Sequence, residues 1–473
     1  MNDSGHILHP DRLLPPDPAT RGIARELYGH VANLPLVCPH GHCEAGWFAS
    51  NEPFPNATEL LVTPDHYVLR MLASQGVSYD DLGLPRTDGS KSQTDPREVW
   101  RLFAQNYHLY RGTPSRIWLD HALHEVLGVE VPLSGSTADH VYDHINAQLA
   151  SPAFAPRALL ERFNIEVLAT TDGATDSLAD HQALKKEGYA SIIPTFRPDA
   201  VTNPRHDDFA TSMQTMAGQT GQDVASWPGY LAALQARRAF FRSLGATATD
   251  HGMLTPLTLD LPAHECQALL DQALAGTLSG EGAARFEAVM LFQMARMSAD
   301  DGMVMQIHAG SRRNYAPSVF QAFGRDKGYD IPSPTQWVNN LKPLLDAFGF
   351  EPNLSVILYT LDETTYSREL APLAGAFPSL TLGAPWWFYD SPEGMRRYRS
   401  AVTETAGYYN TAGFVDDTRA FLSIPARHDM FRRVEAGNLA ALVAEHALGM
   451  DEAMELMDDL AVGLARKAYR LPA

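Results

Sequence analysis

Two histidines separated by one glycine, His40 and His42, are the residues of this sequence best suited to hold a metal ion. They end a run rich in valine, leucine and proline, residues 34–42, for which we expect a β-strand. Side chains two positions apart on a strand point to the same face, so both imidazoles could bind one ion. The plain alternative is a pair of hydrogen-bonded histidines in a surface turn.

Polar residues also end most of the other predicted strands. They are Asp172, Arg197, Asp250, His251, His308, Asp417 and Arg419. In barrels of alternating strands and helices, catalytic residues come from the carboxyl ends of the strands, so this placement favours one shared site. Asp417, on the last strand, would neighbour the first strand and complete a site of two histidines and one carboxylate. His308 would be an additional ligand.

Asp416 competes with Asp417 for this role, because strand alternation lets only one of the two point inward. We prefer Asp417, since Arg419 would then face the same site. Both aspartates could instead cap a turn, and His308 could be a hydrogen-bonded histidine of the core.

The segment TPDHYVLRML, residues 63–72, supplies a further group of polar residues, Asp65, His66, Tyr67 and Arg70. Thr63 or Asp65 could cap a helix that starts here, and Tyr67 could simply pack. From the residues alone, a functional role and this structural one both stay open.

These residues need a framework that brings many strand ends together. Strands are predicted at residues 34–42, 165–172, 190–197, 246–252, 304–310, 354–361, 380–387 and 409–417, and helices between them at 230–244, 283–297, 334–348 and 393–405. Eight strands that alternate with helices indicate an α/β fold with a parallel sheet closed into a (β/α)₈ TIM barrel.

Two regions fall outside this alternation. Residues 44–160 are too long for one crossover and predict an inserted helical subdomain after the first strand, with helices at 65–75, 96–107, 115–127 and 138–149. Residues 430–473 predict C-terminal helices that pack outside the barrel. Because the sequence has no repeats, low-complexity segments or long linkers, we expect residues 1–473 to form a single unit.

The composition restricts the partners and the compartment. The 37 basic and 56 acidic residues give a net charge of −19, which argues against nucleic acid or an anionic membrane surface as the main partner. Three cysteines in 473 residues make a disulfide framework unlikely and favour a reducing compartment. The N-terminus lacks the pattern of a secretion signal, and no apolar run is long enough to span a membrane, so we expect a cytoplasmic protein.

The ordered set of motifs resembles the uronate isomerase (glucuronate isomerase) family of the amidohydrolase superfamily. The matching segments are HGH at 40–42, DHYVLRML at 65–72, TTDGATDSL at 170–178, IPTFRPD at 193–199, DHG at 250–252, MQIHAG at 305–310, WWF at 386–388, DTRAFLS at 417–423 and RHDMFRR at 427–433. The resemblance implies a distorted (β/α)₈ barrel with one divalent metal ion, commonly zinc. It implies interconversion of D-glucuronate with D-fructuronate, and of D-galacturonate with D-tagaturonate.

The resemblance also implies roles for individual residues. His40, His42 and Asp417 would bind the metal, and His308 could join them. Arg197 would meet the substrate carboxylate, and Trp386 would line the substrate site. His66, Tyr67, Arg419 and Asp417 would serve in proton transfer and charge stabilisation, and which of them moves each proton stays open. A small acidic sugar is then the partner, and a homo-oligomer is expected.

The chain departs from the family pattern beside the histidines. Family members commonly carry an aspartate two residues before the first histidine and a leucine after the second, where this chain has Cys38 and Cys43. Alternation would aim Cys38 towards the face of the histidines and Cys43 away from it. Packing is the plain reading for both, and either could instead be a soft metal ligand.

Two other functions compete with the isomerase. A metal-dependent hydrolase of the same superfamily with one metal ion would use the same ligands. Two-metal hydrolases usually add a histidine on the sixth strand and a lysine or acid on the fourth, but the sixth strand here has no histidine and the fourth no lysine. A non-catalytic sugar-acid-binding protein would also fit the barrel, although His40, His42, Asp417 and Arg419 are all present.

Overall fold

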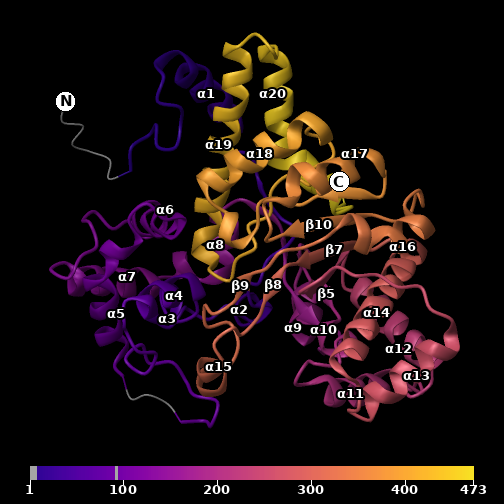
Figure 1. Cartoon of the computed structure of the whole chain (residues 1–473). Coiled ribbons are helices and arrows are strands. Elements are labelled where there is room, and N and C mark those ends of the chain that lie inside the picture. The colour runs from indigo at the N-terminus through magenta and orange to yellow at the C-terminus, as the bar shows by residue number, and fades with distance from the viewer. Residues whose placement is uncertain (1–7, 91–93, 473) are drawn as a thin grey trace.

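Parallel strands form the centre of the computed structural model, which describes residues 8–90 and 94–472 (Figure 1). They are β1 (Leu36–Cys38), β2 (Ile165–Ala169), β3 (Asp172–Gly173), β4 (Ile192–Ile193), β5 (Phe196–Arg197), β6 (Ala248–Met253), β7 (Val304–Ala309), β10 (Val356–Thr360) and β11 (Leu380–Leu382). They pair in the orders β1-β2-β4 and β11-β10-β7-β6-β5-β3. The predicted second and third strands are each interrupted once, and backbone hydrogen bonds from Thr170 N to Ile193 O (2.9 Å) and from Asp172 N to Thr195 O (3.0 Å) join the two sheets into one wall.

The predicted eighth strand, residues 409–417, is an irregular segment. In the described chain its pairing to β11 is a single bridge between Leu382 and Thr411, because Gly413 (φ +71°) and Asp417 (φ +39°) interrupt the extended backbone. It nevertheless closes the barrel. Ala412 N donates to Leu382 O at 2.8 Å, Asp417 N donates to His40 O at 3.3 Å, and His42 N donates to Thr418 O at 3.0 Å.

Helices cover the outside of this wall. They are α9 (Ala179–Lys186), α10 (Asp199–Thr202), α11 (Phe209–Thr220), α12 (Trp227–Ser243), α13 (Ala263–Leu274), α14 (Gly280–Asp301), α16 (Val338–Phe348), α17 (Ala371–Ala376) and α18 (Pro392–Ala406). Helix α15 (Pro317–Phe323) instead packs on the helical insertion. A serine side chain caps α12, α14 and α18. Met305 and Ile307 of β7 pack against these helices, whereas Gln306 and His308 alternate to the interior, as the two-residue period of a strand requires.

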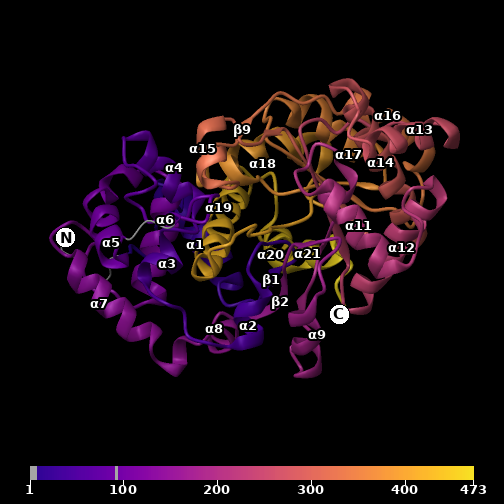
Figure 2. The same ribbon diagram turned by 90° about the horizontal axis from the view of Figure 1, so that it is seen from below.

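The region predicted as an insertion is helical and lies beside the barrel in both views (Figures 1 and 2). Its helices are α2 (Ala45–Ser50), α3 (Ala57–Leu61), α4 (His66–Ser74), α5 (Pro96–Gln105), α6 (Pro114–His121), α7 (Ala138–Leu149) and α8 (Pro156–Arg162). Buried side chains such as Trp100 and Phe103 belong to a core that continues into the barrel at Leu36 and Leu168, and Trp100 Nε1 donates to Ala138 O at 2.9 Å. Whether residues 44–160 act as a separate unit stays a prediction.

The C-terminal helices do more than pack on the outside. Helix α1 (Pro18–Val31) lies along α19 (Ile424–Ala444) and α20 (Met450–Asp458), and α21 (Leu464–Ala468) follows (Figure 1). The fully buried Tyr469 then reaches into the barrel, where its hydroxyl lies 2.6 Å from that of Tyr359 and donates to Gln306 Oε1 at 2.8 Å. Gln306 precedes His308 by two residues on β7, so Tyr469 closes the amino end of the barrel.

A short hairpin of β8 (Ser311–Arg312) and β9 (Ile331–Pro332) follows β7. Among the described residues, no helix combines the length and apolar character needed to cross a membrane.

Removal of the buried Tyr469 hydroxyl tests whether this residue stabilises the amino end of the barrel, where it forms a plug. Tyr469→Phe removes a hydrogen-bond donor to Gln306 and a partner of Tyr359, so it should lower the free energy of unfolding by about 1–3 kcal/mol. The midpoint of urea unfolding measures this loss. Tyr315→Phe, at an exposed tyrosine, is the control, and equal midpoints for the two variants would contradict the role given to Tyr469.

Candidate metal centre and active site

His40 and His42 follow β1 and lie beside Asp417, which the barrel-closing segment supplies. The Nε2 atoms of His40 and His42 are 3.4 Å and 3.0 Å from the Asp417 carboxylate. The left-handed backbone at Asp417 is uncommon outside glycine but is tolerated by aspartate. The structure thus brings these three residues together, although Asp417 does not sit on an alternating strand as the sequence argument assumed.

His308, on β7, approaches the same point from the barrel wall. Its ring stacks on that of His40 with centroids 4.8 Å apart, and its Nδ1 lies 2.7 Å from Asp250 Oδ1. Burial favours the neutral acid, but Arg197 and His308 outweigh it and hold the pKa of Asp250 well below its usual value. An ionised Asp250 fixes the hydrogen of His308 on Nδ1 and leaves the Nε2 lone pair free, a pattern common in metal-binding histidines.

The donor atoms fit a divalent metal ion. Ligand atoms of His40, His308 and Asp417 all lie within 4.8 Å of one another, and His42 is beside Asp417. Among the described residues, His308 Nε2 is buried without a hydrogen-bond partner, and the neighbours of the buried Asp417 Oδ1 are the Nε2 atoms of His40 and His42, which can themselves be ligands. Buried polar atoms are rarely left unpaired, and a cation would satisfy both.

A cavity of about 830 Å³ opens above this centre. Seven of the predicted site residues line it: His42, His66, Tyr67, Arg197, Trp386, Asp417 and Arg419. His40 and His308 are buried beneath it, and the edge of the Trp386 ring faces His308. Two predicted strand-end residues point elsewhere, because Thr170 holds Asp172 and Thr249 holds His251 outside this cavity.

His66 and Tyr67 begin α4, whose N-cap is Asp65. The Asp65 carboxylate accepts hydrogen bonds from Tyr67 N (2.8 Å) and Val68 N (3.4 Å), so capping belongs to Asp65 and leaves the next two side chains free to face the cavity. Burial and the charge of Arg419 lower the pKa of His66 to about 3, so its ring is neutral at neutral pH. Burial raises the pKa of Tyr67, which stays protonated as a hydrogen-bond donor.

Two arginines of the cavity are held by carboxylates. Arg197 Nε donates to Asp199 at 2.9 Å, and its Nη1 is 3.1 Å from Asp250. Arg419 Nη2 donates to Asp326 at 2.9 Å. Asp199 ends the motif IPTFRPD, so the sequence carries a signal for it. Asp326 has none, because it lies in an irregular loop without periodicity.

Arg427 and Asp390 were also missed. Their side chains form a buried ion pair, and the Arg427 guanidinium lies 3.6 Å from the centre of the Trp118 ring and 5.7 Å from that of Tyr67. Arg427 stands in the quoted motif RHDMFRR, so a signal existed, whereas nothing in the residues around Asp390 marks it as part of a site.

Cys38 does not face the histidines as alternation predicted. Strand β1 ends at Cys38, and Pro39 follows it, so alternation does not carry over from residue 38 to residue 40. The Cys38 thiol lies 3.6 Å from His428 Nε2 on α19, and Cys43 donates to Thr418 O at 3.6 Å.

The family model described as glucuronate isomerase matches residues 19–469. The chain belongs to the glucuronate isomerase family. It is similar to a uronate isomerase of Xanthomonas campestris pv. campestris (strain 8004), with 55% identity over 466 residues, which cover 98% of this chain and 99% of the relative.

Two crystal structures extend the likeness to the fold. A glucuronate isomerase from Caulobacter crescentus matches with a TM-score of 0.97 and 53% identity over 98% of this chain and 97% of its own. A uronate isomerase from Thermotoga maritima matches with a TM-score of 0.91 and 28% identity over 98% of this chain and 100% of its own. The expected α/β barrel of this family is therefore confirmed, with an irregular eighth segment.

The contact between Asp250 and His308 gives a prediction for metal binding. Asp250→Asn removes the charge that orients the His308 ring, so the affinity for a metal ion should fall about 10- to 100-fold. Competition with a coloured chelator measures the change. Asp172→Asn, at a carboxylate held by Thr170 outside the cavity, is the matched control, and an unaltered affinity in Asp250→Asn would refute the role of Asp250 in orienting His308.

Proposed function

We propose that this chain is a uronate isomerase that interconverts D-glucuronate with D-fructuronate, and D-galacturonate with D-tagaturonate. The observation that carries the proposal is the cavity in which the metal-binding donors, a buried tyrosine and two arginines meet. Family membership over residues 19–469 supports the same reaction. An acidic open-chain sugar of six carbons is small enough for this space, and arginine suits its carboxylate.

We assign the metal to His40, His42 and Asp417, with His308 as a further ligand. Nitrogen and carboxylate donors of this kind suit zinc, which is the ion we propose. When bound, a divalent ion supplies a Lewis acid that stabilises negative charge on the oxygens of the sugar.

The substrate would lie between Arg197 and the metal centre. Arg197 uses Nε and Nη1 on Asp199 and Asp250, and its remaining N–H donors can hold the carboxylate of the sugar acid. Trp386 offers an apolar wall to the carbon chain, and the neutral His66 can hydrogen-bond a sugar hydroxyl. This orientation would place C1 and C2 near Asp417.

The reaction then moves one proton between neighbouring carbons. The Asp417 carboxylate takes the proton from C2, and the electrons of that bond form the C1–C2 double bond of an enediolate. The protonated Tyr67 hydroxyl and the Arg419 guanidinium stabilise the charge that develops on O1. Tyr67 then gives its hydroxyl proton to O1 and regains a proton from O2, while Asp417 returns the proton taken from C2 to C1, so that C2 becomes the carbonyl carbon of the ketose.

Three further expectations stay predictions: a homo-oligomer, a cytoplasmic location and the choice of zinc. The runner-up functions remain the hydrolase with one metal ion and the sugar-acid-binding protein. Turnover of lactones or amides without turnover of uronates would favour the first, and uronate binding without proton exchange would favour the second.

Proton exchange tests the proposed reaction directly. The metal-loaded protein is incubated with D-glucuronate in deuterated water and followed by NMR. The ketose should form and should carry deuterium from the solvent, because the transferred proton resides on a side chain between the two carbons. A metal-loaded protein that converts neither glucuronate nor galacturonate would rule the isomerase out.

The hydroxyl of Tyr67 gives a second prediction. Tyr67→Phe should lower kcat by about 10²- to 10⁴-fold with little loss of bound metal, because it removes a donor at O1 and no metal ligand. Steady-state kinetics with metal analysis measures both quantities. Tyr142→Phe is the control, since Tyr142 in the helical insertion is as buried as Tyr67, each with 7% of its surface exposed. Equal kcat values for Tyr67→Phe and the control would contradict the role.

A further inference from the structure

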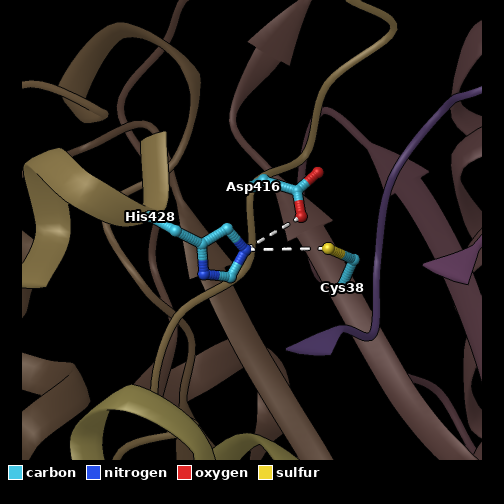
Figure 3. A group of neighbouring side chains, drawn as sticks. All are labelled: Cys38, Asp416 and His428. Atoms are coloured by element: carbon cyan, nitrogen blue, oxygen red, sulfur yellow. Dashed lines mark hydrogen bonds and ion pairs between the residues drawn. The ribbon is translucent and has the colours of Figure 1, made fainter. Parts of the chain in front are cut away.

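We propose that Cys38, Asp416 and His428 form a second metal site, distinct from the one formed by His40, His42 and Asp417. Cys38 ends β1, Asp416 lies in the segment that closes the barrel, and His428 lies on α19. Figure 3 shows the three side chains converging on one point in the barrel wall. The site would therefore join three parts of the fold that are far apart in the sequence.

A single nitrogen stands at the centre of this cluster. His428 Nε2 lies 3.6 Å from Cys38 Sγ and 3.4 Å from Asp416 Oδ2 (Figure 3). One ring nitrogen carries either a hydrogen or a lone pair, so it cannot donate to the carboxylate and accept from the thiol at once. The distance of 3.4 Å is also long for a good N–H···O hydrogen bond. The Cys38 thiol also has Asp416 as a hydrogen-bond partner, so the atom of this cluster that has no hydrogen-bond partner among the described residues is Asp416 Oδ1.

A cation in the middle would satisfy all three groups. With zinc at about 2.3 Å from sulfur and about 2.0–2.1 Å from nitrogen and oxygen, tetrahedral ligand atoms lie about 3.3–3.6 Å from one another. The distances from His428 Nε2 to Cys38 Sγ and Asp416 Oδ2, 3.6 Å and 3.4 Å, lie within this range. The centre formed by His40, His42 and Asp417 has similar spacing, 3.4 Å and 3.0 Å between nitrogen and oxygen.

Burial and charge agree with a metal ion. Cys38 and Asp416 are fully buried and His428 nearly so. A thiolate and a carboxylate together balance a divalent cation, so the filled site would be neutral, as a buried site needs. Within the described chain, Asp416 Oδ1 is a buried atom without a hydrogen-bond partner, so the carboxylate is not fully satisfied by its neighbours. The sulfur donor favours zinc or another thiophilic ion.

A catalytic triad of cysteine, histidine and aspartate does not fit the same residues. In such triads the carboxylate holds the imidazole through the nitrogen opposite the nucleophile, whereas here the sulfur and the carboxylate both face Nε2. His428 also lines a second cavity of about 570 Å³ outside the barrel, next to Leu36 and Arg432. Of the three residues of the cluster, His428 alone is among the residues that line this cavity.

Cobalt loading tests the proposal, because a thiolate bound to Co²⁺ gives a charge-transfer absorption that nitrogen and oxygen ligands do not. The purified wild-type chain, stripped of metal and loaded with Co²⁺, should bind two ions per chain and show this band. Cys38→Ser should lose the band and one ion. Cys266→Ser, at a buried cysteine on α13, is the matched control and should keep both. Asp417→Ala should lose one ion and keep the band.

Three results would overturn the proposal: one cobalt ion per chain in the wild type, absence of the thiolate band in the wild type, or a band that persists in Cys38→Ser. The wild-type spectrum alone decides the matter if Cys38→Ser does not fold. The readout is independent of the proposed function, because an inactive wild type with two ions and a thiolate band would refute the isomerase and keep the second site.

Discussion

Two backbone hydrogen bonds, from Asp417 N to His40 O and from His42 N to Thr418 O, hold the barrel closed at its carboxyl end. They join the first strand to an irregular segment that has little ladder pairing of its own. The same two contacts set the distance between the histidines and the Asp417 carboxylate. Closure of the barrel and assembly of the metal centre therefore depend on the same two hydrogen bonds, and a change that breaks these bonds would disturb both.

Buried ion pairs hold the other charged side chains of the site in position. Asp250 lies between Arg197 and His308, so a single buried carboxylate positions a cavity arginine and a candidate metal ligand. Asp326, which lies in a loop, forms an ion pair with Arg419 and positions it in the same way. Charges buried in this way are costly unless paired, and the pairing keeps each guanidinium in place before substrate arrives. The arginines of the cavity are thus in position before substrate binds.

The sequence predicts what depends on local pattern. Apolar runs locate seven strands, and the polar residues after them identify His40, His42, His308 and Asp417, because parallel strands end at one edge. It does not predict features set by tertiary context. The left-handed backbone at Asp417 breaks the eighth strand, Pro39 redirects the chain between Cys38 and His40, and the loop that carries Asp326 has no periodicity. The position of Tyr469 in the barrel depends on the path of all the C-terminal helices, so the residues around Tyr469 do not predict it.

The plug formed by Tyr469 has a consequence for how the protein is made. His40 and His42 are synthesised early, whereas Asp417 and Tyr469 follow much later in the chain. Domains complete their folding only when the whole unit has been synthesised. The nascent chain therefore carries His40 and His42 without their partner carboxylate until Asp417 has been made, so the complete set of ligands comes together late in synthesis. A chain that stops before Tyr469 would lack the side chain that contacts Tyr359 and Gln306 and closes the amino end of the barrel.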